Sequence, residues 1–135
     1  MARTAVIKGL GVHLPPQVVT NSMLAQEVDT SDQWIRSRTG IRQRHIAAEH
    51  ETTSELAVHA GQKALESAGI TQVDAVLLST TTPNEYCPGT APRVASELGL
   101  PKVAALDISA ACSGFVYGVS VANSMISAGL FKSVL

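Results

Sequence analysis

The chain has 135 residues and a formal net charge of −1 at pH 7, and hydrophobic residues make up 45% of it and charged residues 16%. This composition excludes a disordered or collagen-like chain, and the lack of a basic excess excludes nucleic acid as an expected partner. No apolar run reaches the roughly 18 to 20 residues that span a bilayer, so we expect a cytoplasmic protein with no membrane association.

The first part of the chain predicts two strands and two short helices. An apolar segment ended by two prolines indicates the first strand, and an imperfect alternation of apolar and polar residues indicates the second. Asn21 and Ser31 are residue types that cap helices, and Gly40 is placed to end the second helix. In chain order, these elements are a strand at 5–12, a helix at 22–28, a helix at 32–37 and a strand at 41–46.

From Thr52 onward, the sequence predicts helices and strands in alternation. Thr52 and Glu55 have the spacing of a capping box, and small or apolar residues then recur at helical spacing until Gly69. The expected elements are a helix at 52–68, a strand at 75–80, a helix at 90–98, a strand at 103–108 and a helix at 113–128. This order is typical of right-handed crossovers and of a parallel sheet that helices cover on both faces.

The last of these helices is apolar almost all round, because no Lys, Arg, Asp or Glu lies between Ser113 and Phe131. A helix of this kind is expected to pack on more than one side. The residues that follow, up to Leu135, have the pattern of a further strand at its beginning. We therefore expect a chain that is cut in the middle of a sheet.

Cys112 lies between a predicted buried strand and the first turn of this apolar helix. Ligands bind at the carboxyl edge of parallel sheets, and the free N–H groups at a helix N-terminus stabilise a thiolate or the oxyanion of an attacked thioester. The alternative is inert packing, since cysteine is among the most buried residue types. The cysteines and histidines show no metal-ligand spacing, so neither a metal site nor a structural disulfide is expected.

Two segments resemble the β-ketoacyl-acyl carrier protein synthase III family of the thiolase superfamily. They are TSDQWIRSRTGIRQRHIA at 30–47 and DISAACSGFVYG at 107–118. The resemblance implies a thiolase-like α/β fold, with a mixed, mostly parallel five-stranded sheet layered with helices, as the first half of a duplicated αβαβα architecture. Residues 1–135 are then expected to be the N-terminal half of a condensing enzyme whose C-terminal half is absent from this chain.

The resemblance also implies an activity, with Cys112 as the catalytic nucleophile. Cys112 takes an acyl group from acyl-CoA, and the acyl enzyme condenses with malonyl-acyl carrier protein as this loses CO₂, which initiates an acyl chain in fatty acid biosynthesis. The family's His and Asn that bind the malonyl thioester come from the second half, so the chain alone is expected to be inactive. Coenzyme A is a substrate, no metal or other cofactor is implied, and a homodimer is expected.

Trp34 and Arg38 lie four positions apart on one predicted helix and so share a face. In the family, the matching Trp stacks on the adenine of coenzyme A, while the matching Arg and the residue at Thr30 line the same entrance. The spacing alone favours a simpler interpretation, an exposed pair in a cation–π contact. The surrounding motif favours binding of coenzyme A.

Cys87 aligns where many relatives carry a large apolar residue that reaches across the dimer to shape the partner's acyl pocket. A smaller side chain leaves more room for the acyl chain; alternatively, Cys87 is simply a small buried residue of its loop. This loop opens a second hypothesis, a synthase III-like priming or acyl-transfer enzyme of polyketide or other specialised metabolism. A third hypothesis, of another class, is a non-catalytic fragment that binds coenzyme A or dimerises.

Overall fold

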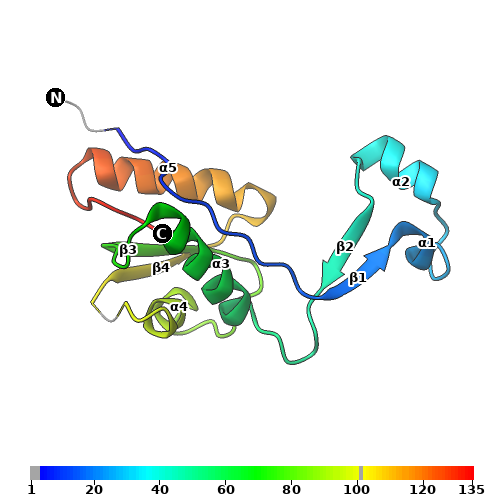
Figure 1. Cartoon of the computed structure of the whole chain (residues 1–135), viewed down its shortest axis with the longest axis horizontal. Coiled ribbons are helices and arrows are strands. Elements are labelled where there is room, and N and C mark those ends of the chain that lie inside the picture. The colour runs from blue at the N-terminus through cyan, green and yellow to red at the C-terminus, as the bar shows by residue number, and fades with distance from the viewer. Residues whose placement is uncertain (1–3, 101) are drawn as a thin grey trace. The chain divides into compact units, whose positions relative to one another are not determined.

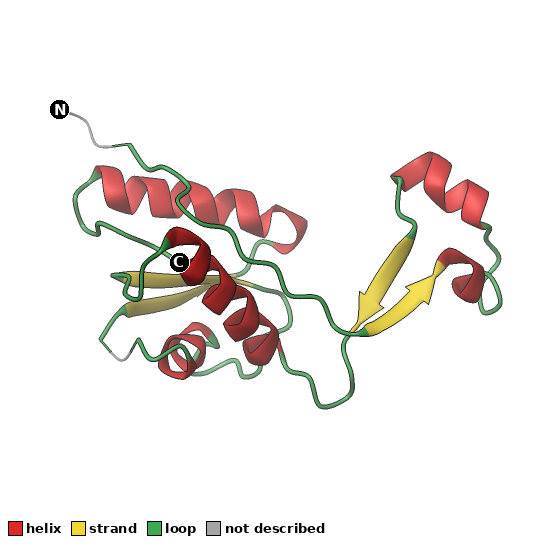
Figure 2. Ribbon diagram, in the orientation of Figure 1, coloured by secondary structure: helices red, strands yellow, loops and turns green. Residues whose placement is uncertain are grey.

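The structure is a computed structural model that describes residues 4–100 and 102–135. The chain divides into a larger unit, made of the N-terminal segment up to His13 together with Thr52–Leu135, and a smaller unit, Leu14–Glu51. Both units contain helices and strands, as Figures 1 and 2 show, which is the α/β composition expected from the sequence. No helix among the described residues is long and apolar enough to cross a bilayer.

The smaller unit is built on an antiparallel pair of strands. In chain order it contains β1 (Gln17–Thr20), α1 (Asn21–Leu24), α2 (Asp32–Thr39) and β2 (Gln43–Ile46). β1 and β2 pair along their whole length. The sequence predicted α2 and β2 but missed β1, because a four-residue strand directly after two prolines has almost no periodic pattern.

Asn21 lies inside α1 and does not cap it, which corrects the expectation from the sequence. The cap is Thr20, whose hydroxyl accepts a hydrogen bond from the Met23 N–H at 3.2 Å. The Asn21 side chain is 1% exposed, and a buried amide must find partners for its own donors and acceptor. These partners come from three parts of the unit: Asp32 Oδ1 at 2.9 Å, the Ile41 carbonyl at 2.8 Å and Arg44 Nη2 at 2.9 Å.

The larger unit alternates helices and strands along the chain, as the sequence predicts. It contains α3 (Thr53–Ala68), β3 (Ala75–Ser79), α4 (Ala91–Glu97), β4 (Ala104–Ile108), the 3₁₀ turn η1 (Ala111–Ser113) and α5 (Gly114–Ser127). β3 and β4 are paired in parallel along all five residues of each. α5 packs on one face of this pair, and α4 packs on the other, where it also contacts α3 (Figure 1).

The main hydrophobic core of the larger unit lies between α3, α4 and β3. Its buried members come from these elements and the turns beside them: Val58, Leu65, Val73, Val76, Val94, Ala95 and Leu100. The predicted capping box of Thr52 and Glu55 starts α3, and Gly69, with a φ of 65°, ends it. These local signals therefore fix the length of the helix that supplies much of the core.

α5 packs against the sheet on one side only, contrary to the expectation from its sequence. It contacts β3 and β4, but Phe115 is 72% exposed and Val116 is 62% exposed. The reason is its place in the layers: the described residues provide no further helix or strand beyond it. Part of the apolar surface of α5 therefore stays exposed in this chain.

The segment at 5–12 is not a strand, which corrects another expectation. Its backbone meets α3 instead, since the Leu10 N–H donates to Ser67 Oγ at 3.3 Å. Gly11 lies so close to the α3 backbone that a Cβ at this position would collide with it. The glycines of this segment thus allow its backbone to pack closely along α3, and the segment pairs with no strand among the described residues.

The five-stranded sheet implied by the resemblance is present only in part among the described residues. β1–β2 and β3–β4 are separate two-stranded sheets. On the other edge of β3, Ala75 forms a parallel bridge with Val134, and the Leu135 N–H donates to the Ala75 carbonyl at 2.9 Å. A further parallel segment therefore begins beside β3 where the sequence predicts it, while the segment at 5–12 adds no strand.

Asp74 holds the start of this last segment. Its Oδ2 accepts hydrogen bonds from the Lys132 N–H at 2.7 Å and the Ser133 N–H at 3.0 Å. These backbone bonds lower the pKa of Asp74 from its ordinary value of 3.8, because they stabilise the charged form. A lowered pKa in the folded state means that this contribution to stability is present above the ordinary pKa and is lost as the pH falls through the lowered one.

We therefore expect Asp74→Asn to lower the urea concentration at the denaturation midpoint at neutral pH. The midpoint of this variant should also fall less steeply than that of the wild type as the pH drops below the ordinary pKa of 3.8, since the amide takes up no proton. Denaturation of the full-length protein at several pH values measures both effects. Asp29→Asn, at an exposed acid of the smaller unit, controls for the loss of one negative charge. An acid dependence as steep in Asp74→Asn as in the wild type would contradict this role of Asp74.

Candidate active site

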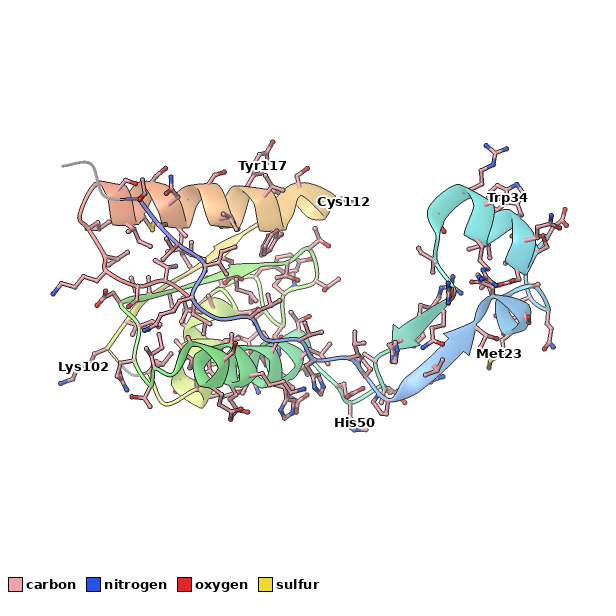
Figure 3. All side chains as sticks on the ribbon, turned by 45° about the horizontal axis from the view of Figure 1, so that its top comes forward. Met23, Trp34, His50, Lys102, Cys112 and Tyr117 are labelled. Carbon is pink, nitrogen blue, oxygen red and sulfur yellow. The ribbon has the colours of Figure 1, made fainter. Side chains whose placement is uncertain are left out.

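Cys112 lies at the edge of the sheet where β3 and β4 end. The two strands end side by side, with Ser79 opposite Ile108, and the Thr80 N–H donates to the Ile108 carbonyl at 3.2 Å. Cys112 follows β4 in the single turn η1, directly before α5 (Figure 3). The placement expected from the sequence, at a helix N-terminus on the carboxyl edge of a parallel pair, is therefore confirmed.

The backbone turns sharply just before Cys112. Ala111 has a φ of 44°, in the left-handed region that residues with a side chain rarely adopt. The Ser113 N–H closes the turn by donating to the Ala110 carbonyl at 3.1 Å. Strained residues of this kind cluster at active sites, where the surrounding structure holds them. The turn leaves Cys112 exposed.

The first turn of α5 begins directly against β3. Gly114 is buried, and a Cβ at this position would collide with Ser79 Oγ, so a larger residue would require Ser79 or the start of the helix to move. Ser113 is the N-cap residue but makes no side-chain capping bond, and the first turn of α5 contains no acidic residue. The Gly114 N–H donates to the Ala111 carbonyl, so an anion or an oxyanion beside Cys112 would bind to the positive end of the helix and to the N–H groups that follow Gly114.

Trp34 and Arg38 lie together on α2 in the smaller unit. Arg38 Cζ is 5.9 Å from the centroid of the Trp34 ring, and Trp34 is 57% exposed (Figure 3). The two side chains therefore share a face of α2, as their spacing predicts. They also form the cation–π contact that an ordinary exposed pair would make. Thr30 comes just before Ser31, which caps α2, and its own Oγ1 is buried with no hydrogen-bond partner among the described residues.

The predicted site residues fall into two groups. Cys112 and Cys87 belong to the larger unit, whereas Thr30, Trp34 and Arg38 belong to the smaller one. Cys87 is exposed in the loop between β3 and α4, so its interpretation as a buried packing residue is wrong. In the described part of the chain, His, Cys, Asp and Glu side chains form no group of three or more that could hold a metal ion.

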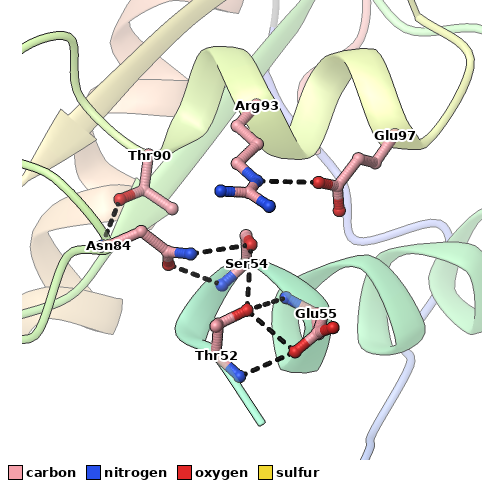
Figure 4. Close-up of polar contacts among 7 residues, drawn as sticks. All are labelled: Thr52, Ser54, Glu55, Asn84, Thr90, Arg93 and Glu97. Carbon is pink, nitrogen blue, oxygen red and sulfur yellow. Dashed lines mark hydrogen bonds and ion pairs between the residues drawn. The ribbon is translucent and has the colours of Figure 1, made fainter. Parts of the chain in front are cut away.

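A buried polar network, which the sequence analysis missed, holds the loop that contains Cys87. Its centre is Asn84, which accepts from the Ser54 N–H and donates to Ser54 Oγ, both at 3.0 Å (Figure 4). The Asn84 N–H donates to Thr90 Oγ1 at 2.9 Å. At the end of the loop, the Thr90 N–H at 2.8 Å and the Ala91 N–H at 2.6 Å donate to the Asp107 carboxylate.

One member of this network has a signal in the sequence. Asp107 is the one charged residue in the β4 sequence AALDI, and a charged side chain in a partly buried strand needs hydrogen-bond partners. The pattern therefore indicates that Asp107 is bonded, although it does not show to which groups.

A family model and several relatives in sequence carry the same description. A family model described as 3-oxoacyl-[acyl-carrier-protein (ACP)] synthase III matches residues 106–135, which include Cys112. A β-ketoacyl-[acyl-carrier-protein] synthase III of Pseudomonas aeruginosa is 56% identical over 135 residues, which cover 100% of this chain and 41% of that protein. The chain thus spans about two fifths of the length of this relative.

Solved structures agree with these sequence matches. The crystal structure of 3-oxoacyl-[acyl-carrier-protein] synthase III from Aquifex aeolicus superimposes with a TM-score of 0.89 at 46% identity, over 95% of this chain and 42% of that one. A priming β-ketosynthase of the R1128 polyketide biosynthetic pathway gives a TM-score of 0.87 at 35% identity, over 95% of this chain and 39% of that one. The thiolase-like fold is thereby confirmed. In sequence and in fold, the chain matches about two fifths of the length of proteins described as β-ketoacyl-acyl carrier protein synthase III.

Proposed function

We propose that the protein is an acyltransferase of the β-ketoacyl-acyl carrier protein synthase III type, which initiates acyl chains in fatty acid biosynthesis. The observation that carries the proposal is the position of Cys112, which is exposed in the turn that leads into the N-terminus of α5, within the segment that the family model matches. A thiol in this position lies beside a helix end that stabilises an anion, and its exposure makes it accessible to a substrate.

In the first step, the Cys112 thiolate attacks the carbonyl carbon of an acyl-CoA. The carbonyl oxygen becomes an oxyanion, which the N–H groups of the first turn of α5 stabilise. The bond between the carbonyl carbon and the sulfur of coenzyme A then breaks, coenzyme A leaves as a thiolate that takes up a proton, and the acyl group stays on Cys112.

In the second step, malonyl-acyl carrier protein loses CO₂, and the electron pair of the broken bond forms a carbanion. The carbanion attacks the carbonyl of the acyl group on Cys112, a carbon–carbon bond forms, and the Cys112 thiolate is released with the 3-oxoacyl product on the carrier protein. The resemblance assigns the stabilisation of the carbanion to a His and an Asn outside this chain. The step needs only thiolate and hydrogen-bond donors, so we propose no metal or organic cofactor.

Incubation of the full-length protein with acetyl-CoA and malonyl-acyl carrier protein tests the proposal. We expect 3-oxoacyl-acyl carrier protein, detected by mass spectrometry, and CO₂ released in equal amount. A protein that binds acyl-CoA but forms neither product would support the third hypothesis, a non-catalytic fragment. A homodimer and a cytoplasmic location remain predictions, which gel filtration and cell fractionation test.

Priming in polyketide or other specialised metabolism is a second candidate function, because the R1128 priming β-ketosynthase superimposes on the chain as well as the fatty acid enzymes do. The exposed Cys87, small where many relatives are expected to carry a large residue, is consistent with a longer acyl group. Initial rates with acyl-CoA donors from two to eight carbons distinguish the two functions. A preference for acetyl-CoA favours fatty acid initiation, and a preference for longer or branched donors favours the second candidate.

Trp34→Ala is expected to weaken the binding of acyl-CoA by about 1 to 3 kcal/mol, the range for a base that stacks on an aromatic side chain. Binding is measured by calorimetry, and activity is compared with acyl-CoA and with a short acyl-pantetheine thioester, which lacks the nucleotide. Only the acyl-CoA reaction should suffer. Gln33→Ala, at the exposed neighbouring position of α2, is the matched control, and equal losses with both donors would contradict a role of Trp34 in binding the nucleotide.

A further inference from the structure

The loop between β3 and α4, residues 80–90, has an exposed tip on a buried, hydrogen-bonded base. At the tip, Tyr86 is 95% exposed and Cys87 is also exposed. At the base, Ser54 is 0% exposed and Thr90 is 2% exposed, and Asn84 links the two through the bonds shown in Figure 4. These bonds fix the backbone of the loop on both sides of its exposed tip.

Asp107 closes the loop onto β4. Its two carboxylate oxygens accept the Thr90 and Ala91 N–H groups, so Asp107 caps α4 from a different element. The Thr90 side chain makes no capping bond, because its hydroxyl accepts from the Asn84 N–H instead. Gly89 lies against the same carboxylate: a Cβ on Gly89 would be 2.9 to 3.1 Å from the Asp107 carboxyl atoms.

The loop and the nucleophile therefore share one support. The loop leaves the sheet at the end of β3, beside the end of β4, and it returns to Asp107, which is one residue from the end of β4. The chain then continues from β4 through η1 to Cys112. A displacement of the loop end is transmitted to the strand that positions Cys112, because Asp107 belongs to β4 and its carboxylate holds the loop end.

We propose that Asp107 is a positioning residue that holds the 80–90 loop against β4 and thereby sets which acyl groups Cys112 accepts. The part that concerns acyl groups rests on the proposed function. Asp107 does not touch the substrate: it acts through Gly89, Thr90 and Ala91, whose backbone it fixes. Loss of the carboxylate leaves one or both N–H groups without an acceptor and frees the loop end to move.

Asp107→Asn in the full-length protein tests the proposal, since the amide keeps one acceptor oxygen but turns N–H groups toward one of the two donors. Asp74→Asn is the matched control, because Asp74 also accepts two backbone N–H groups of the larger unit, at a site away from the loop. Hydrogen exchange of the amides of residues 84–91 is expected to be faster by about tenfold or more in Asp107→Asn and unchanged in Asp74→Asn.

The second measurement is the ratio of kcat/KM for acetyl-CoA to that for a six-carbon acyl-CoA. We expect this ratio to change by about tenfold in Asp107→Asn and to stay at the wild-type value in Asp74→Asn. A displacement of about 1 Å near a reacting group can change a rate by about a hundredfold, so a tenfold change in the ratio requires only a small movement. A general loss of folded protein lowers both kcat/KM values together, so it does not move the ratio.

Gly89→Ala is a second variant for the case that Asp107→Asn does not fold, because it keeps the carboxylate but pushes the loop away from it. Like Asp107→Asn, it should make hydrogen exchange of residues 84–91 faster, and it should change the kcat/KM ratio of the two acyl-CoA donors in the same direction. Unchanged exchange in both variants would overturn the proposed hold on the loop, and faster exchange with an unchanged ratio would overturn the link to acyl choice. A wild-type protein without acylation would contradict the proposed function, whereas the exchange measurement would still decide whether Asp107 holds the loop.

Discussion

Cys112→Ala is expected to abolish acylation of the protein by acyl-CoA and to lower the rate of condensation by about a thousandfold or more. Alanine cannot form the thioester, and the residues beside it in η1, Ala111 and Ser113, include no other thiol. Cys112→Ser should also be nearly inactive, because a hydroxyl without an adjacent strong base stays protonated. Mass spectrometry of the intact protein and of its peptides after incubation with acyl-CoA measures the acyl group and locates it.

Cys87→Ser is the matched control for this experiment, since Cys87 is the other cysteine of the chain and is also exposed. It should still be acylated on Cys112, and only its preference among acyl donors is expected to change. A thioester found on Cys87, with Cys112 unlabelled, would contradict the assignment of the nucleophile. Acylation of Cys112 without condensation would separate the first proposed step from the second.

Gly114→Ala is expected to lower the stability of the larger unit by about 1 to 3 kcal/mol, the usual cost of overpacking a filled site. The added Cβ would collide with Ser79 Oγ and lie 3.1 Å from Ser79 Cβ, so the start of α5 must move away from β3. Cys112 precedes this turn directly, and its displacement should lower condensation by about a hundredfold. Thermal denaturation and initial rates of the full-length protein measure the two effects.

The matched control for Gly114→Ala is Gly118→Ala, one turn further along α5, where an added Cβ has no atom within 4 Å. This change should be neutral or stabilise the protein by up to about 1 kcal/mol, because alanine favours a helix over glycine. Ser79→Ala removes the colliding oxygen, so adding it to Gly114→Ala should restore most of the lost stability. Equal behaviour of Gly114→Ala and Gly118→Ala would show that the close start of α5 is unimportant.

Several features of the fold were predictable because their signals are local. The capping box of Thr52 and Glu55 and the left-handed Gly69 mark both ends of α3, and the structure confirms them. β1 was not predictable in the same way, because its four residues gain their strand conformation from pairing with β2. Asn21 is a residue type that often caps helices, but its side chain is buried here and forms hydrogen bonds with Asp32 and Arg44 instead.

The candidate site shows the same division. The position of Cys112 followed from chain order, since a strand, a short turn and a helix in sequence place the residue between them at the carboxyl edge of a parallel sheet. The pairing of Trp34 with Arg38 followed from helical spacing. The network that contains Asn84 and Asp107 could not be predicted, because it joins distant residues. Ser54 and Asn84 are 30 positions apart, and Thr90 and Asp107 are 17 positions apart.

The sequence by itself determined which residues form helices and strands from Thr52 onward, the place of Cys112 between a strand and a helix, and the resemblance to the synthase III family. The tertiary structure alone decided that the segment at 5–12 packs along α3, that α5 leaves Phe115 exposed, and that Asp107 holds the loop before α4. The physical reason is the range of the interactions. Caps, turns and periodicity act over a few residues, whereas burial and hydrogen-bond partners depend on which distant surfaces meet.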